Sequence, residues 1–168
     1  MPRDLAHIYD THARAIFAFL LNLTRNDADA GDILQDVFVK VAERPSLLDG
    51  VREMRPWLIR MAHRQAIDLV RRRGSHARAV ESSAEEMPLF APAEDADGDA
   101  FRAAVAEAMA ELPDEQRAVV HLKVWEDMTF AQIADALGLS ANTAASRYRY
   151  ALDKLEALLR PLNKEYQP

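Results

Sequence analysis

Hydrophobic residues recur every three or four positions along the first 75 residues, and this spacing predicts three helices. The first covers residues 5–23 and is interrupted at Asn26-Asp27. The second runs from about residue 29 to 43, and the third from near residue 56 to 73, where Gly74 ends it. Period-2 alternation between turns is absent from both ends of the chain, and β-branched residues are sparse. The pattern therefore predicts an all-α fold.

A second helical region follows residue 100. Helices are expected over residues 101–112 and from Pro113 to about residue 125. Thr129 to Gln132 fits a capping box, which begins a short helix that ends at Gly138. Ser140 then caps a long final helix, expected to end before Pro161. A short capped helix, a tight break and a longer helix predict a helix-turn-helix.

The final helix has one apolar and one polar face. Ala144, Tyr148, Ala151 and Leu155 share a narrow sector that must face the core. The exposed face of its first turns holds short polar side chains and arginines, which suit base edges and phosphates in a major groove. Its candidate DNA-contacting residues are Ser140, Asn142, Thr143, Ser146, Arg147 and Arg149. The alternative is a helical hairpin that merely carries polar residues outside.

The third helix carries a basic stripe. One side is apolar, and the opposite side holds Trp57, Arg60, Arg64 and Arg71, with His63 at its edge. The residues of the apolar side are Leu58, Ala62, Ala66, Leu69 and Val70. Arginine can donate two hydrogen bonds to one phosphate, and an indole can stack on an unpaired base, so this face suits melted DNA. The alternative is that Trp57 fills the core and the arginines only provide solubility.

The net charge of −6 is unevenly distributed. Residues 1–75 carry +2, residues 76–100 carry −6 and residues 101–168 carry −2. The middle segment contains Pro88, Pro92, Gly98 and a run of acids without a helical period, so we interpret it as a flexible acidic linker. The expected organisation is two small helical domains, 1–75 and 101–168, joined by a linker over 76–100.

Composition narrows the function classes. The chain has no cysteine, which excludes disulfides, thiol nucleophiles and Cys-ligated zinc. The longest apolar stretch is far below the roughly 20 residues that span a bilayer, and the N-terminus lacks a signal-peptide core, so we expect a cytoplasmic protein without membrane insertion. The histidines form no metal motif, and no phosphate loop or nucleophile elbow is present. We expect no catalysis, metal or cofactor.

The second helix has an acidic face, and Phe38 projects near its end. The residues of this face are Asp29, Asp32, Gln35, Asp36 and Glu43. Carboxylates spaced in this way could hold a metal, but without histidine ligands they are usually just solvated. A docking surface for a basic protein partner explains them better.

The ordered set of motifs resembles one family. The stretches DILQDVFVK from Asp32, RPWLIRMAHRQAIDLVRRR from Arg55, ELPDEQR from Glu111 and the segment 129–154 are similar to those of the extracytoplasmic-function (ECF) group of bacterial RNA polymerase sigma factors. The resemblance covers nearly the whole chain. It implies a region 2 helical bundle and a region 4 helix-turn-helix, with core RNA polymerase, promoter DNA and an anti-sigma factor as partners.

The resemblance also implies roles for individual residues. Docking on the polymerase clamp would use Asp32, Gln35, Asp36 and Phe38. Recognition of the −10 element would use Asp49, Gly50, Val51, Arg52, Glu53, Trp57, Arg60, His63, Arg64 and Arg71, and the helix-turn-helix residues named above would contact the −35 element. The chain departs from the family at Ala145, Leu152 and Asp153, where basic residues are common, and at Arg64, where many members have Asn.

Two other functions use some of the same features. A sigma mimic that sequesters an anti-sigma factor without binding DNA would need the helical surfaces but not the arginines beside Trp57. A stand-alone repressor would need a dimer and a palindromic site, which the asymmetric two-part layout does not suggest.

Overall fold

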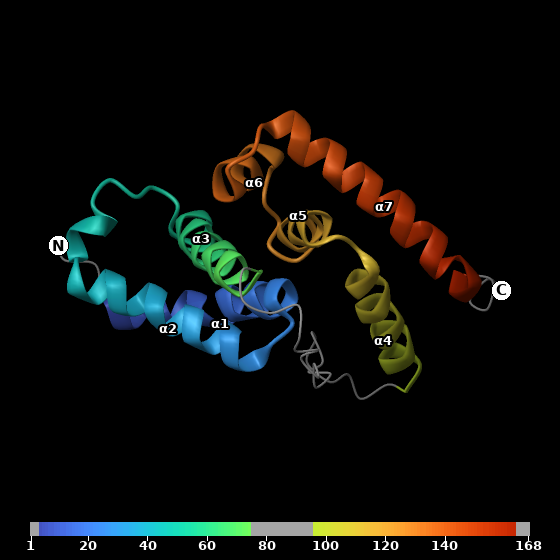
Figure 1. Ribbon diagram of the computed structural model, residues 1–168, viewed down its shortest axis with the longest axis horizontal. Helices are drawn as coiled ribbons and strands as arrows, with labels where there is room; N and C mark the ends of the chain where they lie inside the picture. The colour runs from blue at the N-terminus through green and yellow to red at the C-terminus, as the bar shows by residue number, and fades with distance from the viewer. Residues whose placement is uncertain (1–3, 75–95, 164–168) are drawn as a thin grey trace.

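The computed structural model describes residues 4–74 and 96–163 (Figure 1). Within these ranges the chain is helical and contains no strand, which confirms the predicted all-α fold. The elements are α1 (Leu5–Thr24), α2 (Asp27–Glu43), the 3₁₀ helix η1 (Pro45–Leu48), α3 (Met54–Gly74), α4 (Ala96–Glu111), α5 (Asp114–Val124), α6 (Phe130–Leu137) and α7 (Ala141–Asn163).

Local signals in the sequence set the ends of the first helices. The Asp4 side chain caps α1 by accepting a hydrogen bond from the backbone of Ala6 at 3.0 Å. At its other end Arg25 adopts a left-handed conformation, with φ of 53°. Asn26 then caps α2 by accepting from the backbone of Asp29 at 3.0 Å. The predicted break at Asn26-Asp27 is therefore a C-cap followed at once by an N-cap.

The helices α1, α2 and α3 pack into a small bundle. Its centre is formed by fully buried residues from all three helices, namely Ile16, Phe19, Leu20, Val37, Leu58, Ile59, Ala62 and Ala66. These include Leu58, Ala62 and Ala66, which the helical wheel placed on the core side of α3. The wheel placed Leu69 and Val70 there too; Leu69 is half-buried against the core, but Val70 is 54% exposed, so the prediction was wrong for Val70. The wheel did not predict Ile59 as buried; both Leu58 and Ile59 lie inside because α3 is covered along a broad face.

The helices α4 to α7 form the second unit, and its helix-turn-helix is confirmed in detail. Thr129 and Gln132 make both hydrogen bonds of a capping box at the start of α6. Gly138 ends α6 with a φ of 71°, a conformation that favours glycine. The Ser140 hydroxyl accepts from the backbone of Thr143 at 3.1 Å at the start of α7.

Two predicted boundaries were wrong. The segment predicted as linker, 76–100, extends too far, because α4 already begins at Ala96; residues 75–95 lie outside the described part of the chain. The final helix was expected to end before Pro161, but α7 continues to Asn163. A proline removes one backbone donor. In the last turn the carbonyl that loses this donor can be hydrated, so the helix continues with little cost.

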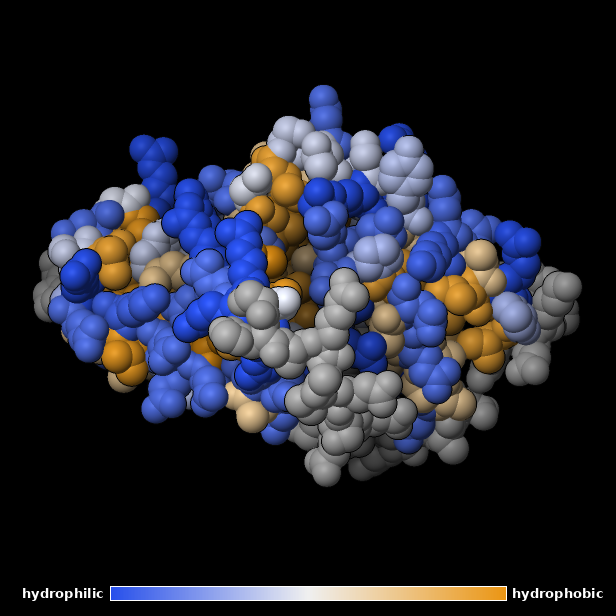
Figure 2. Space-filling model, viewed as in Figure 1, coloured by the Kyte–Doolittle hydropathy of each residue, from blue (hydrophilic) through white to orange (hydrophobic). Residues whose placement is uncertain are grey.

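The two helical units pack directly against each other. Helix α1 contacts α5, and α3 contacts α6 (Figure 1). A single hydrophobic cluster continues from the first unit into residues of the second, including Val119, Leu122, Ile133 and Ala136. Viewed from the same side, the surface is largely hydrophilic, with hydrophobic side chains gathered in a strip near the centre, where α6 approaches α3 (Figure 2). A smaller cluster, with Met109, Leu112, Val120 and Ala151, lies entirely within the second unit.

Candidate nucleic-acid interface

The basic stripe lies along the side of α3 that faces away from the core of its bundle. Arg64 and Arg71 are exposed, and the Arg60 side chain retains 41% of its accessible surface. Arg60 lies 3.7 Å from the Asp135 carboxylate of α6. The arginines thus remain at the surface, as the helical wheel predicted, but one of them already faces a carboxylate from the second unit.

Trp57 lies on the same stripe and is half-buried. It packs against the hydrophobic cluster that contains Leu58 of its own helix and Ile133 of α6. Both interpretations therefore describe part of its environment, because the residue packs against the interior and is also partly accessible to solvent. His63, at the margin of the stripe, is also half-buried, and burial lowers its pKa, so its ring is neutral at neutral pH.

The loop before α3 carries the remaining residues assigned to the −10 element. Asp49, Gly50 and Arg52 are exposed, and Val51 is half-buried. Gly50 has a φ of 76°, a backbone conformation that favours glycine because it has no Cβ. Glu53, at the end of the loop, accepts a hydrogen bond from the Gln132 side chain of α6 at 2.9 Å.

The start of α7 presents its polar face to solvent. Asn142 and Arg149 are exposed, and Ser146 is half-buried. Ala144 and Ala151 on the opposite face are fully buried, which fixes the rotation of the helix. Arg147 is half-buried and forms an ion pair with Glu115 of α5, with 3.3 Å between Nη2 and Oε2. Ser140 and Thr143 cap the helix through their own hydrogen bonds, so their side chains stabilise its N-terminus.

The acidic face of α2 also lies at the surface. Asp32, Gln35 and Asp36 are exposed, whereas Phe38 is only 7% exposed. The Phe38 ring packs edge-on against Tyr9 of α1, with 4.9 Å between ring centroids. Asp29, at the start of the same helix, is buried and forms a two-point ion pair with Arg73 of α3. Its role is therefore to join α2 to α3.

A groove that the sequence analysis missed runs between α1 and α2, beside this acidic face. Its volume is about 800 Å³. Apolar side chains form most of its walls, and Gln35 and Arg14 lie in its lining. The residues that line it are Tyr9, Ala13, Arg14, Phe17, Gly31, Leu34, Gln35, Phe38, Val39 and Ala42. The repeat Tyr9-Ala13-Phe17 on α1 is the signal in the sequence, since these residues share one face of the helix. Ala13 and Phe17 are half-buried at the edge of the bundle core, and Tyr9 is exposed.

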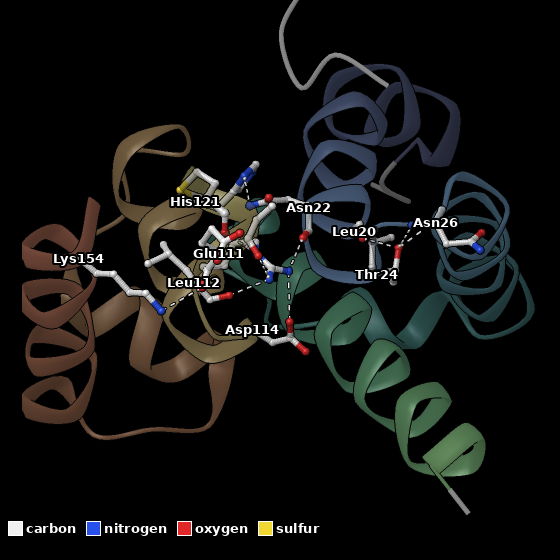
Figure 3. Close-up of polar contacts among 12 residues, drawn as sticks. Leu20, Asn22, Thr24, Asn26, Glu111, Leu112, Asp114, His121 and Lys154 are labelled. Atoms are coloured by element: carbon white, nitrogen blue, oxygen red, sulfur yellow. Dashed lines mark hydrogen bonds and ion pairs between the residues drawn. The ribbon is translucent and has the colours of Figure 1, made fainter. Parts of the chain in front are cut away.

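Two buried polar residues of α5 were also missed. Arg117 is 4% exposed, and its guanidinium donates to the carbonyls of Met109 at 2.9 Å and Leu112 at 2.8 Å, which end α4. It also donates to the carbonyl of Asn22 in α1 at 3.1 Å. Figure 3 shows Asn22, Leu112 and Asp114 converging on this point from different elements. An arginine on the apolar face of α5 is the available signal, but its partners are distant in sequence.

His121, one turn further along α5, is 2% exposed. The Asn22 amide donates to its Nδ1 at 3.2 Å. Its ring lies between Phe19 of α1, at 5.8 Å between centroids, and Trp125, at 5.6 Å. Burial lowers the pKa of His121 to about 4, so the ring is neutral in this arrangement.

Within residues 4–74 and 96–163, no group of three or more histidine and carboxylate side chains is arranged to hold a metal ion. No helix in the same ranges is sufficiently long and apolar to cross a membrane.

Two family matches coincide with the two helical units. Residues 8–76 match the family described as sigma-70 region 2, and residues 102–155 match sigma-70 region 4. The chain belongs to the sigma-70 family of sigma factors. Among its relatives, the ECF RNA polymerase sigma factor SigL of Mycobacterium tuberculosis is 31% identical over 92% of this chain and 88% of its own length. The sigma factor CarQ of Myxococcus xanthus is 32% identical over 94% of this chain and 90% of its own length. These relatives place the sigma factor in the ECF group.

Two solved structures share the fold. One is the sigma factor RpoE of Bartonella quintana in complex with the anti-sigma factor NepR, with a TM-score of 0.75 and 20% identity over 94% of this chain and 98% of that one. The other is CnrH in complex with the cytosolic domain of CnrY, with a TM-score of 0.66 and 24% identity over 94% of this chain and 88% of that one. The family models and the relatives named above confirm the family that the ordered motifs suggested.

Proposed function

We propose that this sigma factor binds core RNA polymerase through the exposed face of α2 and reads two promoter elements through α3 and α7. It directs initiation in the cytoplasm and catalyses no reaction itself. The observation that carries the proposal is the presence of two helices, in separate units, each fixed in rotation by a buried apolar face and each presenting arginines on the other. A sigma mimic would not need either set of arginines.

The α3 stripe and the preceding loop are suited to melted DNA at the −10 element. Arg60 and Arg64 can contact the phosphates of a single strand, and the Trp57 ring offers a surface on which an unpaired base can stack. The turn at Gly50 lets the backbone approach a base that has left the duplex. Each unstacked base costs a few kcal/mol, which contacts of this kind offset.

The first turns of α7 are suited to duplex DNA at the −35 element. Asn142 and Arg149 are exposed on the outer face, where a helix inserted in the major groove contacts base edges and phosphates. The capping hydrogen bonds of Ser140 and Thr143 hold this end of the helix in place. Leu152 and Asp153 follow where the family is often basic, so we expect fewer phosphate contacts and a weak dependence of −35 affinity on the second half of α7.

The docking surface for polymerase joins the acidic face of α2 to the groove beside it. Asp32 and Asp36 supply negative charge for a basic partner, while the groove offers an apolar recess for its side chains. Phe38 acts from inside this surface, because its buried ring forms part of the groove wall. The resemblance implies that the partner is the coiled coil of the polymerase clamp. It also implies control by an anti-sigma factor, the kind of partner bound by the structural relative RpoE.

The test is reconstituted transcription. Transcript start sites mapped after overexpression supply candidate promoters, and purified chain with core polymerase is then assayed on them in run-off reactions. We expect specific transcripts with the wild-type chain and binding without transcripts for Trp57→Ala combined with Arg60→Ala. Core polymerase binding by both proteins, with no promoter-dependent transcript from either, would contradict the proposal and favour a mimic.

A further inference from the structure

The last two turns of α3 have little support from the core of the bundle. Ala66 is the last fully buried residue of the helix, and Leu69 is only half-buried against the core. Val70 is 54% exposed, and residues 71–74 are exposed. Helix ends with few buried contacts open readily. These turns carry Arg71 of the basic stripe, so its position depends on contacts outside the apolar core.

A two-point ion pair joins this end of α3 to the start of α2. Nη2 of Arg73 donates to Oδ1 of Asp29 at 2.8 Å, and Nη1 donates to the other carboxylate oxygen. The Asp29 side chain is 12% exposed, so its carboxylate is shielded from water. The Asp29 backbone is fixed too, because its amide donates to the capping Asn26 side chain at 3.0 Å. A pair with two parallel hydrogen bonds constrains the orientation of both side chains.

Both charges also suit the helices that carry them. Asp29 lies in the first turn of α2, where a helix favours negative charge, and Arg73 lies in the last turn of α3, where a helix favours positive charge. Asp32 and Asp36 lie further along α2 and are exposed, so they remain accessible to a partner. The pair thus connects the helix proposed to dock on polymerase with the helix proposed to read the −10 element.

The ion pair of Arg73 also sets the direction of Arg71. Successive side chains of an α-helix are about 100° apart, so Arg71 and Arg73 differ by about 200° around the helix axis. Because Arg73 is held on α2, Arg71 points away from α2. Arg60, Arg64 and Arg71, at intervals of four and seven residues, then lie within about 40° of one another. They form one row of cations along the helix.

We infer that Asp29 is a positioning residue for the −10 element: through Arg73 it holds the last turns of α3, so that Arg71 meets the melted strand in line with the other arginines of the stripe. This inference rests on the proposed function of α3. Asp29 does not itself contact DNA. Loss of its carboxylate lets Arg71 leave the row, and the protein then loses about one phosphate contact.

The test uses the whole chain bound to core polymerase, on a forked template from a mapped promoter in which the −10 element is single-stranded. Asp29→Asn removes one negative charge from the protein, so on charge alone it should strengthen DNA binding. The positioning role predicts the opposite sign. Asp27→Asn, at an exposed position in the same first turn of α2, makes the same change in charge and is the matched control.

We expect affinity for the fork to fall about fivefold in Asp29→Asn and to change by less than about twofold in Asp27→Asn. In Asp29→Asn the slope of log affinity against log salt should become shallower by about 0.7, the value for one phosphate of a single strand. Arg73→Lys keeps the net charge but cannot make the two-point contact, and it should lower the affinity about twofold. This variant also provides the test if Asp29→Asn folds poorly.

A double-mutant cycle separates positioning from a general loss of stability. In an Arg71→Ala background, Asp29→Asn should cause no further fall, because the contact that Asp29 positions is already absent. A general loss of stability would lower the affinity equally in both backgrounds and would also weaken binding to core polymerase. Hydrogen exchange makes the same distinction: in Asp29→Asn, amides 70–74 should exchange about fivefold faster or more, whereas those of Leu58 and Ile59 should not change.

Two results would overturn the inference: an affinity in Asp29→Asn that is equal to or above that of Asp27→Asn, or an equal fall with and without Arg71. A higher affinity would mean that Arg73, once released, binds DNA itself. Trp57→Ala on the same template separates these failures from failure of the proposed function. If Trp57→Ala weakens binding to the fork while either result is observed, the function stands and the inference alone fails. If Trp57→Ala has no effect, both fail.

Discussion

His121 of α5 lies where the two units pack against each other. Its ring is buried between Phe19 and Trp125, and it receives one hydrogen bond from Asn22. Its other nitrogen, Nε2, is buried and has no hydrogen-bond partner among the described residues. Because Nδ1 accepts from Asn22, the neutral ring carries its proton on Nε2, and protonation of Nδ1 would place an uncompensated charge in this buried site.

Acid should lower the free energy of unfolding through His121. Its pKa is about 4 when buried and about 6.5 when exposed. The folded state thus favours the neutral ring. The contribution of the neutral ring to stability is complete above pH 6.5 and is lost as the pH falls toward 4. The free energy of unfolding should drop by roughly 1–2 kcal/mol between pH 7 and pH 5. Chemical denaturation across this range measures it.

The matched variant for this prediction is His121→Gln, which keeps a polar partner for Asn22 but cannot titrate. Its unfolding free energy should depend less on pH than that of the wild type over the same interval. Equal slopes for the two proteins would show that His121 does not cause the pH dependence of the unfolding free energy. His63, whose pKa burial also lowers, remains in both proteins and cancels from the comparison.

Arg117 should be the most sensitive polar residue of the second unit. Arg117→Met keeps much of the side-chain volume but removes the side-chain donor from the carbonyls of Leu112 and Asn22. The Met109 carbonyl loses the same donor but keeps the backbone donor of Leu112. The expected loss is about 2–4 kcal/mol, since each buried acceptor left unpaired costs about 1 kcal/mol or more. Thermal unfolding measures it, and Arg160→Met, exposed near the end of α7, is the control. A loss below about 0.5 kcal/mol would contradict the bridging role.

At the scale of elements, the sequence was a good guide wherever a boundary depends on neighbouring residues. Thr129, Gly138 and Ser140 were recognised as caps because each acts within four positions of itself. The core face of α7 followed from its period for the same reason. The predictions fail at Ala96 and Pro161, where no local cap marks the boundary: acidic composition predicts a linker and a proline predicts a helix end, but the helices extend further.

The capping box of α6 should contribute measurably to the helix-turn-helix. Thr129→Ala removes the acceptor for the Gln132 backbone and should cost about 1 kcal/mol of stability. Thr129→Ser retains the hydroxyl and should be close to the wild type. Hydrogen exchange of α6 amides and −35 duplex affinity are the readouts. An unchanged exchange rate in Thr129→Ala would show that tertiary packing alone fixes this helix.

Arg149 should supply a phosphate or base contact from α7. It is exposed and lies on the face opposite Ala144 and Ala151. Arg149→Ala should weaken −35 duplex binding by about 1–3 kcal/mol if the contact is to a base, or lower the salt dependence by about one ion if it is to a phosphate. Arg160→Ala, exposed near the end of the same helix, is the control. Identical titrations for both variants would remove Arg149 from the interface.

At the scale of the whole molecule, the sequence predicted both units but not how they meet. Motifs predicted the roles of α2, α3 and α7, because most residues of each predicted surface are neighbours in the sequence. The contacts between α3 and α6, and between Asn22 and His121, join residues about 80 to 100 positions apart, and no local period encodes them. The ambiguity over Trp57 had the same origin, since its burial depends on the second unit.

The central claim is that α3 and α7 read different promoter elements. Run-off transcription with core polymerase on a mapped promoter, with each element altered in turn, tests it most directly. Asn142→Ala should abolish the effect of −35 changes while preserving that of −10 changes, and Trp57→Ala should do the reverse, with polymerase binding intact in both. If both variants lost discrimination at the same element, or at neither, the assignment of the two helices would be wrong.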